Sequence, residues 1–207
     1  MSRFVGEVLK ETISVNLASF ERVDLGREDL RPAAVALPVV LHDAGESSLI
    51  LTRRSPRLST HAGQRAFPGG RVEADEAPTE TALREMAEEI GLAVDASAVL
   101  GLLDDYPTRS GFLITPVVVW CGRDPQLTLD PREVASVQYI PLAELDRPDV
   151  PRLVPGAEAG RFEIEVPVGS DSIHAPTAAI LFQFREVALH GRSTRVSEYD
   201  QPRFAWS

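Results

Sequence analysis

Residues 70–92 read GRVEADEAPTETALREMAEEIGL, and the organisation of the whole chain is best approached from this stretch. Pro78 suits the first turn of a helix, where its missing N–H is not needed. Gly91 suits the position just after a helix, where the backbone often adopts the left-handed conformation. Between them, three apolar residues recur at helical spacing and share one face: Ala82, Met86 and Ile90. The pattern predicts a helix over residues 78–90.

The same helix carries three carboxylates, on Glu85, Glu88 and Glu89, at positions i, i+3 and i+4 of one face. Carboxylates this close raise one another's pKa unless a positive charge lies among them. A divalent cation with oxygen ligands supplies that charge, and Mg²⁺ is usual where phosphates complete the ligand set. Gly69 and Gly70 precede the helix and allow the backbone to approach an ion or a phosphate closely. The alternative is a solvated acidic helix face, which is the usual meaning of an isolated acidic run.

The rest of the chain has the pattern of a mixed α/β domain. Strands are expected at residues 33–41, 48–54, 99–103, 112–120, 134–140 and 162–168. Helices are expected near the N-terminus and over residues 176–190. We divide the chain into an N-terminal helix and arm (1–31), one domain (32–191) and a C-terminal tail (192–207). The tail is expected either to be loosely ordered or to dock on a partner.

Composition narrows the function classes. The chain has 207 residues and a formal net charge of −10, from 31 acidic and 21 basic side chains. This excess argues against nucleic acid as a partner, because polyanion binding needs clustered cationic charge. The single cysteine, Cys121, excludes a cysteine-rich zinc site and an intrachain disulfide. The apolar runs are too short to span a bilayer, so we expect no membrane partner and a cytoplasmic protein.

Residues 70–92 also fit a longer pattern, Gly-x5-Glu-x7-Arg-Glu-U-x-Glu-Glu-x-Gly-U, in which U is a bulky apolar residue. Every specified position matches: Gly70, Glu76, Arg84, Glu85, Met86, Glu88, Glu89, Gly91 and Leu92. A chance match of this length is negligible at average residue usage. The pattern resembles the Nudix box, and the chain is thereby identified as a candidate Nudix hydrolase. The resemblance implies an α/β/α sandwich with a mixed β-sheet and a loop–helix–loop metal site.

The resemblance also implies Mg²⁺- or Mn²⁺-dependent hydrolysis of a nucleoside diphosphate linked to another group. It assigns Glu85 and Glu89 as principal metal ligands, with Glu88 as a further ligand or a residue that orients water, and the Gly69 carbonyl as a possible addition. Glu76 and Arg84 are expected to form an ion pair that braces the loop, and Gly70 and Gly91 serve the motif structurally. Glu133, just before an expected strand, is the candidate for a catalytic glutamate outside the box, the alternative being a solvated loop carboxylate.

The upstream sequence LTRRSPRLSTHAGQRAFPGG, residues 51–70, resembles the extra motif of the coenzyme A diphosphatase branch of that family. The similarity implies coenzyme A or an acyl-CoA as substrate. One specified arginine of the motif falls on Ser59. Residues 52–69 contain several arginines and no acid, which suits the outer phosphates of a nucleotide. The candidate substrate-binding residues are Arg53, Arg54, Arg57, His61 and Gln64.

Two other readings stay open. Pro107 lies fifteen residues beyond Leu92, where the ADP-sugar diphosphatase branch often carries a proline, so that branch is the alternative substrate class. Some Nudix-fold domains bind nucleotides without hydrolysing them, but these usually have a broken box. A homodimer formed through the apolar N-terminal helix and the tail aromatics Phe204 and Trp206 is the expected assembly.

Overall fold

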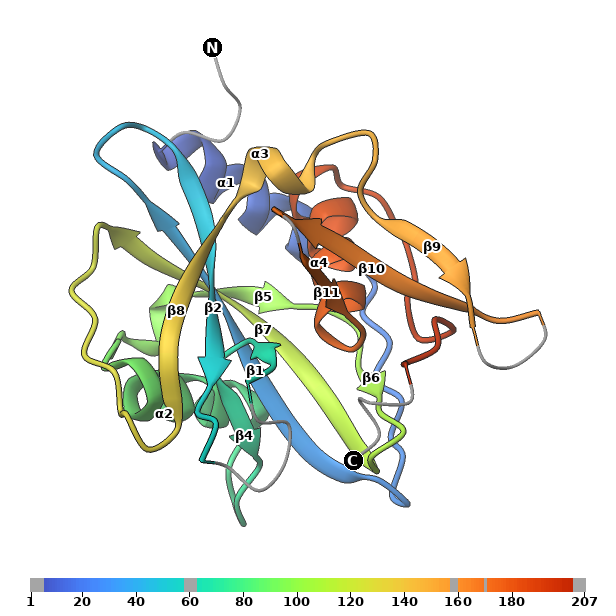
Figure 1. The fold of residues 1–207 in the computed structure, drawn as a ribbon. Coiled ribbons are helices and arrows are strands. Elements are labelled where there is room, and N and C mark those ends of the chain that lie inside the picture. The colour runs from blue at the N-terminus through green and yellow to red at the C-terminus, as the bar shows by residue number, and fades with distance from the viewer. Residues whose placement is uncertain (1–5, 58–62, 157–159, 170, 203–207) are drawn as a thin grey trace.

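The central feature of the structure, a computed structural model, is a mixed β-sheet (Figure 1). The structure describes residues 6–57, 63–156, 160–169 and 171–202. Within them the main sheet has the strand order β3-β2-β1-β7-β5, while β4 pairs with β1, β6 with β7 and β8 with β2. In the described part of this sheet, β1 and β7 pair in parallel and the other pairs are antiparallel. The strands are β1 (Arg31–Leu41), β2 (Ser47–Arg54), β3 (Arg65–Ala66), β4 (Gly69–Arg71), β5 (Val99–Leu102), β6 (Tyr106–Pro107), β7 (Phe112–Arg123) and β8 (Val134–Pro141).

Helix α2 (Pro78–Ile90) covers one face of this sheet. Its apolar side packs on alternate residues of the two central strands, which point to the same face because side chains alternate along a strand. The buried residues of this layer include Ala82, Met86 and Ile90 from the helix, Ala34, Ala36 and Val40 from β1, and Val117 and Val119 from β7. The layer fixes α2, and with it the acidic face, relative to the sheet.

The opposite face is covered by helices α1 (Gly6–Ala18) and α4 (Thr177–Phe184) and by a small antiparallel sheet (Figure 1). That sheet has the order β11-β10-β9 and consists of β9 (Arg152–Pro155), β10 (Phe162–Val168) and β11 (Asp171–His174). A short helix, α3 (Leu142–Leu145), connects β8 to it, and a 3-10 turn, η1 (Ala96–Ala98), precedes β5. Helices therefore lie on both faces of a mixed sheet, which confirms the predicted fold class.

Several predicted elements are confirmed, whereas the C-terminal helix and the small sheet differ from what was predicted. The predicted helix at 78–90 has the same bounds as α2. The helix predicted over 176–190 is instead α4 followed by a π-helical turn, η2 (Arg185–Leu189). The helix end is closed by the amides of Gly191 and Arg192, which donate to the carbonyls of Val187 and Glu186. The small sheet was predicted only at β10, because β9 and β11 have four residues each and carry too little periodicity to be recognised.

The terminal segments dock on the chain itself, contrary to what the sequence suggested. The apolar face of α1 (Leu9, Ile13 and Leu17) is buried in the core, so it is not free for a dimer interface. The described part of the tail also packs on the domain: the Tyr106 hydroxyl donates to the Tyr199 carbonyl at 3.0 Å. Phe204 and Trp206 lie outside the described residues.

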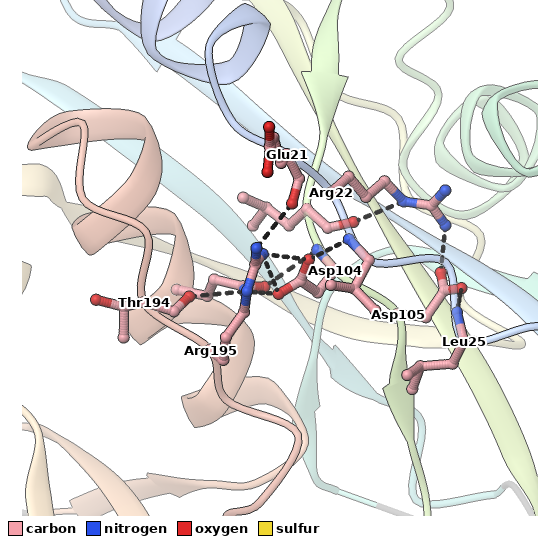
Figure 2. Close-up of polar contacts among 10 residues, drawn as sticks. Glu21, Arg22, Leu25, Asp104, Asp105, Thr194 and Arg195 are labelled. Carbon is pink, nitrogen blue, oxygen red and sulfur yellow. Dashed lines mark hydrogen bonds and ion pairs between the residues drawn. The ribbon is translucent and has the colours of Figure 1, made fainter.

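Asp104, in the loop after β5, connects the N-terminal arm with the C-terminal segment (Figure 2). Nη1 of Arg195 donates to its two carboxylate oxygens at 2.8 and 2.9 Å. The amide of Val23 donates to the same carboxylate at 2.7 Å, and Nε2 of Gln183 donates at 2.6 Å. The Asp104 side chain is buried, so these bonds replace the water that its charge would otherwise need.

Asp105 holds the N-terminal arm in the same way. Its carboxylate accepts hydrogen bonds from Nη2 of Arg22 at 2.5 Å and from the amide of Leu25 at 3.2 Å. Asp104 and Asp105, together with Arg22 and Arg195, are called the arm–tail clasp below (Figure 2).

None of the helices in the described residues has the length and hydrophobicity that spanning a bilayer requires.

Candidate functional site

The candidate site begins where the glycine loop meets α2. Gly69 and Gly70 lie on β4, which pairs with β1 so that Gly70 is opposite Ala34. The Glu85 carboxylate lies directly against Gly70: a Cβ added there would be 2.2 Å from its Oε1. A Cβ added at Gly69 would instead be 2.4 Å from the backbone oxygen of Ala34. Gly70 leaves room for the Glu85 carboxylate, and Gly69 leaves room for the paired backbone of β1.

Arg84 braces this corner. Its guanidinium donates to both oxygens of Glu76, with Nε–Oε1 2.7 Å and Nη2–Oε2 3.0 Å, which is the ion pair that the Nudix resemblance implies. The Arg84 hydrogen bonds lower the pKa of Glu76 to about 2. Nη1 of Arg84 also reaches Oε1 of Glu85 at 2.7 Å and Oε2 of the exposed Glu88 at 3.2 Å. Arg84 is thus shared by three carboxylates.

Glu89 is the most buried carboxylate of the site. The residue is 3% exposed, and its Oε1 accepts a hydrogen bond from the Gly69 amide at 3.4 Å. Burial raises its pKa to about 7, the Gly69 hydrogen bond and the charge of Arg54 oppose that rise, and Glu85 and Glu133 add to it. Burial also raises the pKa of Glu85, against the opposing effect of Arg84. For both carboxylates the effect of burial thus outweighs the positive charge that Arg84 and Arg54 supply.

The loop before β8 brings Glu133 to the site. The amides of Thr128 and Asp130 donate to the carbonyls of Ile90 and Glu89, at 2.9 and 3.0 Å, which satisfies the free carbonyls at the end of α2. Gly91 permits this contact, because it has φ 69° and a Cβ there would be 2.8 Å from Thr128. The Glu133 charge acts on both Glu85 and Glu89.

The arginines predicted to bind substrate lie at the end of β2. Arg54 is half-buried, and its Nε is buried without a hydrogen-bond partner among the described residues. Arg53 is exposed, and its Nε donates to the Gly63 carbonyl at 3.3 Å. Arg57 is also exposed. Gln64 lies beside β2, because its carbonyl accepts a hydrogen bond from the Arg54 amide. His61 and Ser59 lie outside the described residues.

Two further features near the site were not anticipated. Arg65, on β3, joins the main sheet to the small sheet: it donates to Oε1 of Gln138 at 2.6 Å and to Oδ2 of Asp171 at 2.5 Å. Separately, the guanidinium carbon of Arg31 lies 4.0 Å from the centroid of the Phe112 ring. Both contacts join residues far apart in the chain, so no local sequence pattern predicts them.

The oxygen donors fit a hard divalent cation in their chemistry. The Glu85 and Glu89 carboxylates contact neighbouring glycines and are largely buried, and burial raises the pKa of both, so a bound cation would stabilise their charged forms. In the described part of the chain, however, no three His, Cys, Asp or Glu side chains are close enough to form a ready metal site. Oε1 of Glu85 faces Arg84 instead, so metal binding requires this carboxylate to exchange partners.

Comparison with known proteins agrees with the geometry. A family model described as NUDIX domain matches residues 30–158. A Pectobacterium atrosepticum protein named "Uncharacterized Nudix hydrolase NudL" is 42% identical over 115 residues, which is 55% of this chain and 59% of that protein. "Nudix hydrolase 3" of Caenorhabditis elegans is 37% identical over 152 residues, which is 69% of this chain and 63% of that protein.

The alignments cover about three-fifths of the length of these curated relatives. Among solved structures, a MutT/nudix family protein from Enterococcus faecalis has a TM-score of 0.46 and 16% sequence identity. That alignment covers 83% of this chain and 64% of the other.

Proposed function

The chain belongs to the Nudix family, and from this premise we propose that it hydrolyses the diphosphate bond of a nucleoside diphosphate derivative with the help of Mg²⁺ or Mn²⁺. The observation that carries the proposal is the position of α2. It holds Glu85 and Glu89 against Gly70 and Gly69, within the electrostatic reach of Glu133. A cluster of largely buried carboxylates beside a cationic loop suits a metal-bound diphosphate.

Each residue has a proposed role. Glu85, Glu89 and Glu88 would hold the divalent cation, with the Gly69 carbonyl as a further ligand. When bound, the cation would polarise the diphosphate and offset charge on the leaving oxygen. Glu133 is the proposed acceptor of the proton from the attacking water, and the exposed Glu88 would orient that water. Glu76, Arg84, Gly70 and Gly91 keep the loop and the helix in register.

We propose coenzyme A or an acyl-CoA as the substrate, yielding 3′,5′-ADP and the corresponding phosphopantetheine. The support is the motif at residues 51–70 and its cations, of which Arg53, Arg54 and Arg57 are described by the structure. His61 and Gln64 complete the proposed substrate contacts. The alternative substrate class is ADP-ribose or another ADP-sugar.

The remaining proposals concern location, assembly and domain limits. We propose a cytoplasmic protein with no nucleic-acid or membrane partner, and a domain over residues 32–191. A homodimer stays a prediction, and it would have to use surface other than the buried face of α1, such as the exposed Val8 and Val15. Light scattering at micromolar concentration tests it, and a monomer would exclude it.

The decisive experiment is a screen in which the products are resolved. Coenzyme A, an acyl-CoA, ADP-ribose, NADH and dinucleoside polyphosphates are each incubated with the protein and Mg²⁺ or Mn²⁺. We expect 3′,5′-ADP from coenzyme A, and no turnover by Glu89→Gln. Cleavage of ADP-ribose but not coenzyme A would refute the substrate. Full activity of Glu89→Gln would refute the metal site. Nucleotide binding without any hydrolysis would favour a sensor.

A further inference from the structure

Glu89 and Arg54 carry opposite charges that act on each other in the candidate site, and among the described residues neither forms a salt bridge. Glu89 is buried, and its carboxylate is bound by a backbone amide rather than by a cation. Arg54 has a buried Nε with no hydrogen-bond partner among the described residues. Leaving a buried donor without a hydrogen-bond partner is costly, so the Arg54 Nε calls for a functional or structural explanation.

Strand geometry places Arg54 on the side of the sheet that α2 covers. The β2–β8 register shifts between Arg53 and Arg54, and beyond the shift Arg54 is opposite Val134, which is buried in the layer beneath α2. Paired residues of antiparallel strands point to the same face, so Arg54 lies on the α2 side. The Ser55 amide also donates to the Glu133 carbonyl at 2.7 Å. Arg54 is therefore adjacent to the loop that carries Glu133 and faces the helix that carries Glu89.

The electrostatics of the described residues agree with this placement. Of the nearby charges that act most strongly on Glu89, Arg54 is positive, whereas Glu85 and Glu133 are negative. Arg84, the other arginine of this corner, is already occupied by Glu76, Glu85 and Glu88. Arg54 is thus the cation available to Glu89 when no metal is present.

We propose that Arg54 is the internal counter-ion of Glu89 in the metal-free protein and competes there with the divalent cation. This inference rests on the proposed function, in that Glu89 is a metal ligand. A guanidinium beside the carboxylate repels an incoming divalent cation and offsets part of the charge deficit that attracts it. Metal binding then replaces the electrostatic interaction of Arg54 with Glu89.

The test measures metal binding without substrate. Chelator-treated protein is titrated with Mn²⁺ by calorimetry, comparing the wild type with Arg54→Met, Arg54→Lys and Arg53→Met. Removing a competing charge should tighten Mn²⁺ binding in Arg54→Met by about tenfold. Arg54→Lys keeps the charge, and Arg53→Met removes one from the opposite face of β2, so both should bind within about twofold of the wild type. Unchanged or weaker binding by a folded Arg54→Met would overturn the proposal.

A second measurement separates this inference from the proposed function. In EDTA, Arg54→Met should lower the melting temperature in the wild-type background and not in the Glu89→Gln background, because the carboxylate that it neutralises is absent there. An equal effect in both backgrounds would overturn the counter-ion role. If the screen finds no hydrolysis but both results hold, the proposed activity fails and the Arg54–Glu89 pairing stands.

Discussion

Gly70→Ala should separate the chemistry of the site from the stability of the fold. The added Cβ would be 2.2 Å from Oε1 of Glu85, whereas ordinary contacts begin at 3.4 Å. The carboxylate must therefore move by about 1 Å. Since it is the far end of a flexible side chain, it can do so without moving the backbone. The φ of Gly70 is outside the left-handed region, so alanine introduces no strain.

A displacement of this size is small for folding and large for catalysis. Misplacing a reacting group by about 1 Å can reduce turnover by about 100-fold, so we expect a loss of that order in kcat. We expect the free energy of unfolding, measured by urea denaturation, to remain within about 0.5 kcal/mol of the wild type, as for substitutions that open no cavity. Turnover of the substrate found by the screen and urea denaturation are the two assays.

Gly69→Ala is the matched control. Its Cβ would meet the backbone of Ala34 at 2.4 Å, which no side-chain rotation can relieve, so this variant should lose stability by about 2 kcal/mol or more. If Gly70→Ala unfolds as readily as Gly69→Ala, or keeps full activity, the reasoning that Gly70 exists to seat Glu85 is wrong.

Three further predictions follow from buried or paired groups. The pKa of Glu76 falls from 4.5 to about 2 on folding, so its contribution to stability is present above pH 4.5 and is lost as the pH falls towards 2. Urea denaturation at several pH values should show this loss in the wild type and not in Glu76→Gln. Burial raises the pKa of the Cys121 thiol from 9.0 to about 12, so the native protein holds about 1,000-fold less thiolate and should react with Ellman's reagent only after unfolding. Rapid reaction of the native protein would contradict its burial. Asp104→Ala leaves the clasp without its central carboxylate and should cost about 3 kcal/mol of unfolding free energy, whereas a loss below about 1 kcal/mol would show that Arg195 and its neighbours re-pair with water.

The sequence predicted α2 to the residue because three independent signals agree there. Pro78 suits the first turn, Gly91 adopts the left-handed conformation, and the apolar residues between them repeat at helical spacing. The longer strands were predicted for a similar reason: β1 and β7 are continuous apolar runs, as expected for strands buried on both faces.

The parts that could not be predicted depend on contacts between distant segments. β4 consists of two glycines and Arg71, a sequence typical of a loop, and it forms a strand because β1 lies alongside it. Likewise, the apolar stripe of α1 predicted a buried face, but nothing local could distinguish a partner subunit from the chain's own core. The proposed roles of Glu133 and Arg54 likewise depend on their proximity to α2, which is distant in the sequence.

The arm–tail clasp bears on the order in which the chain folds. Nη2 of Arg195 donates to the carbonyl of Glu21, 174 residues earlier, and Arg22 reaches Asp105 across 83 residues. The α2 corner, by contrast, is built from pairs such as Arg84 and Glu76, eight residues apart. Contacts between distant residues require the closure of long loops and therefore tend to form late. During synthesis from the N-terminus, the acidic corner can assemble well before Arg195 has been made, and the arm stays without its final anchor until then.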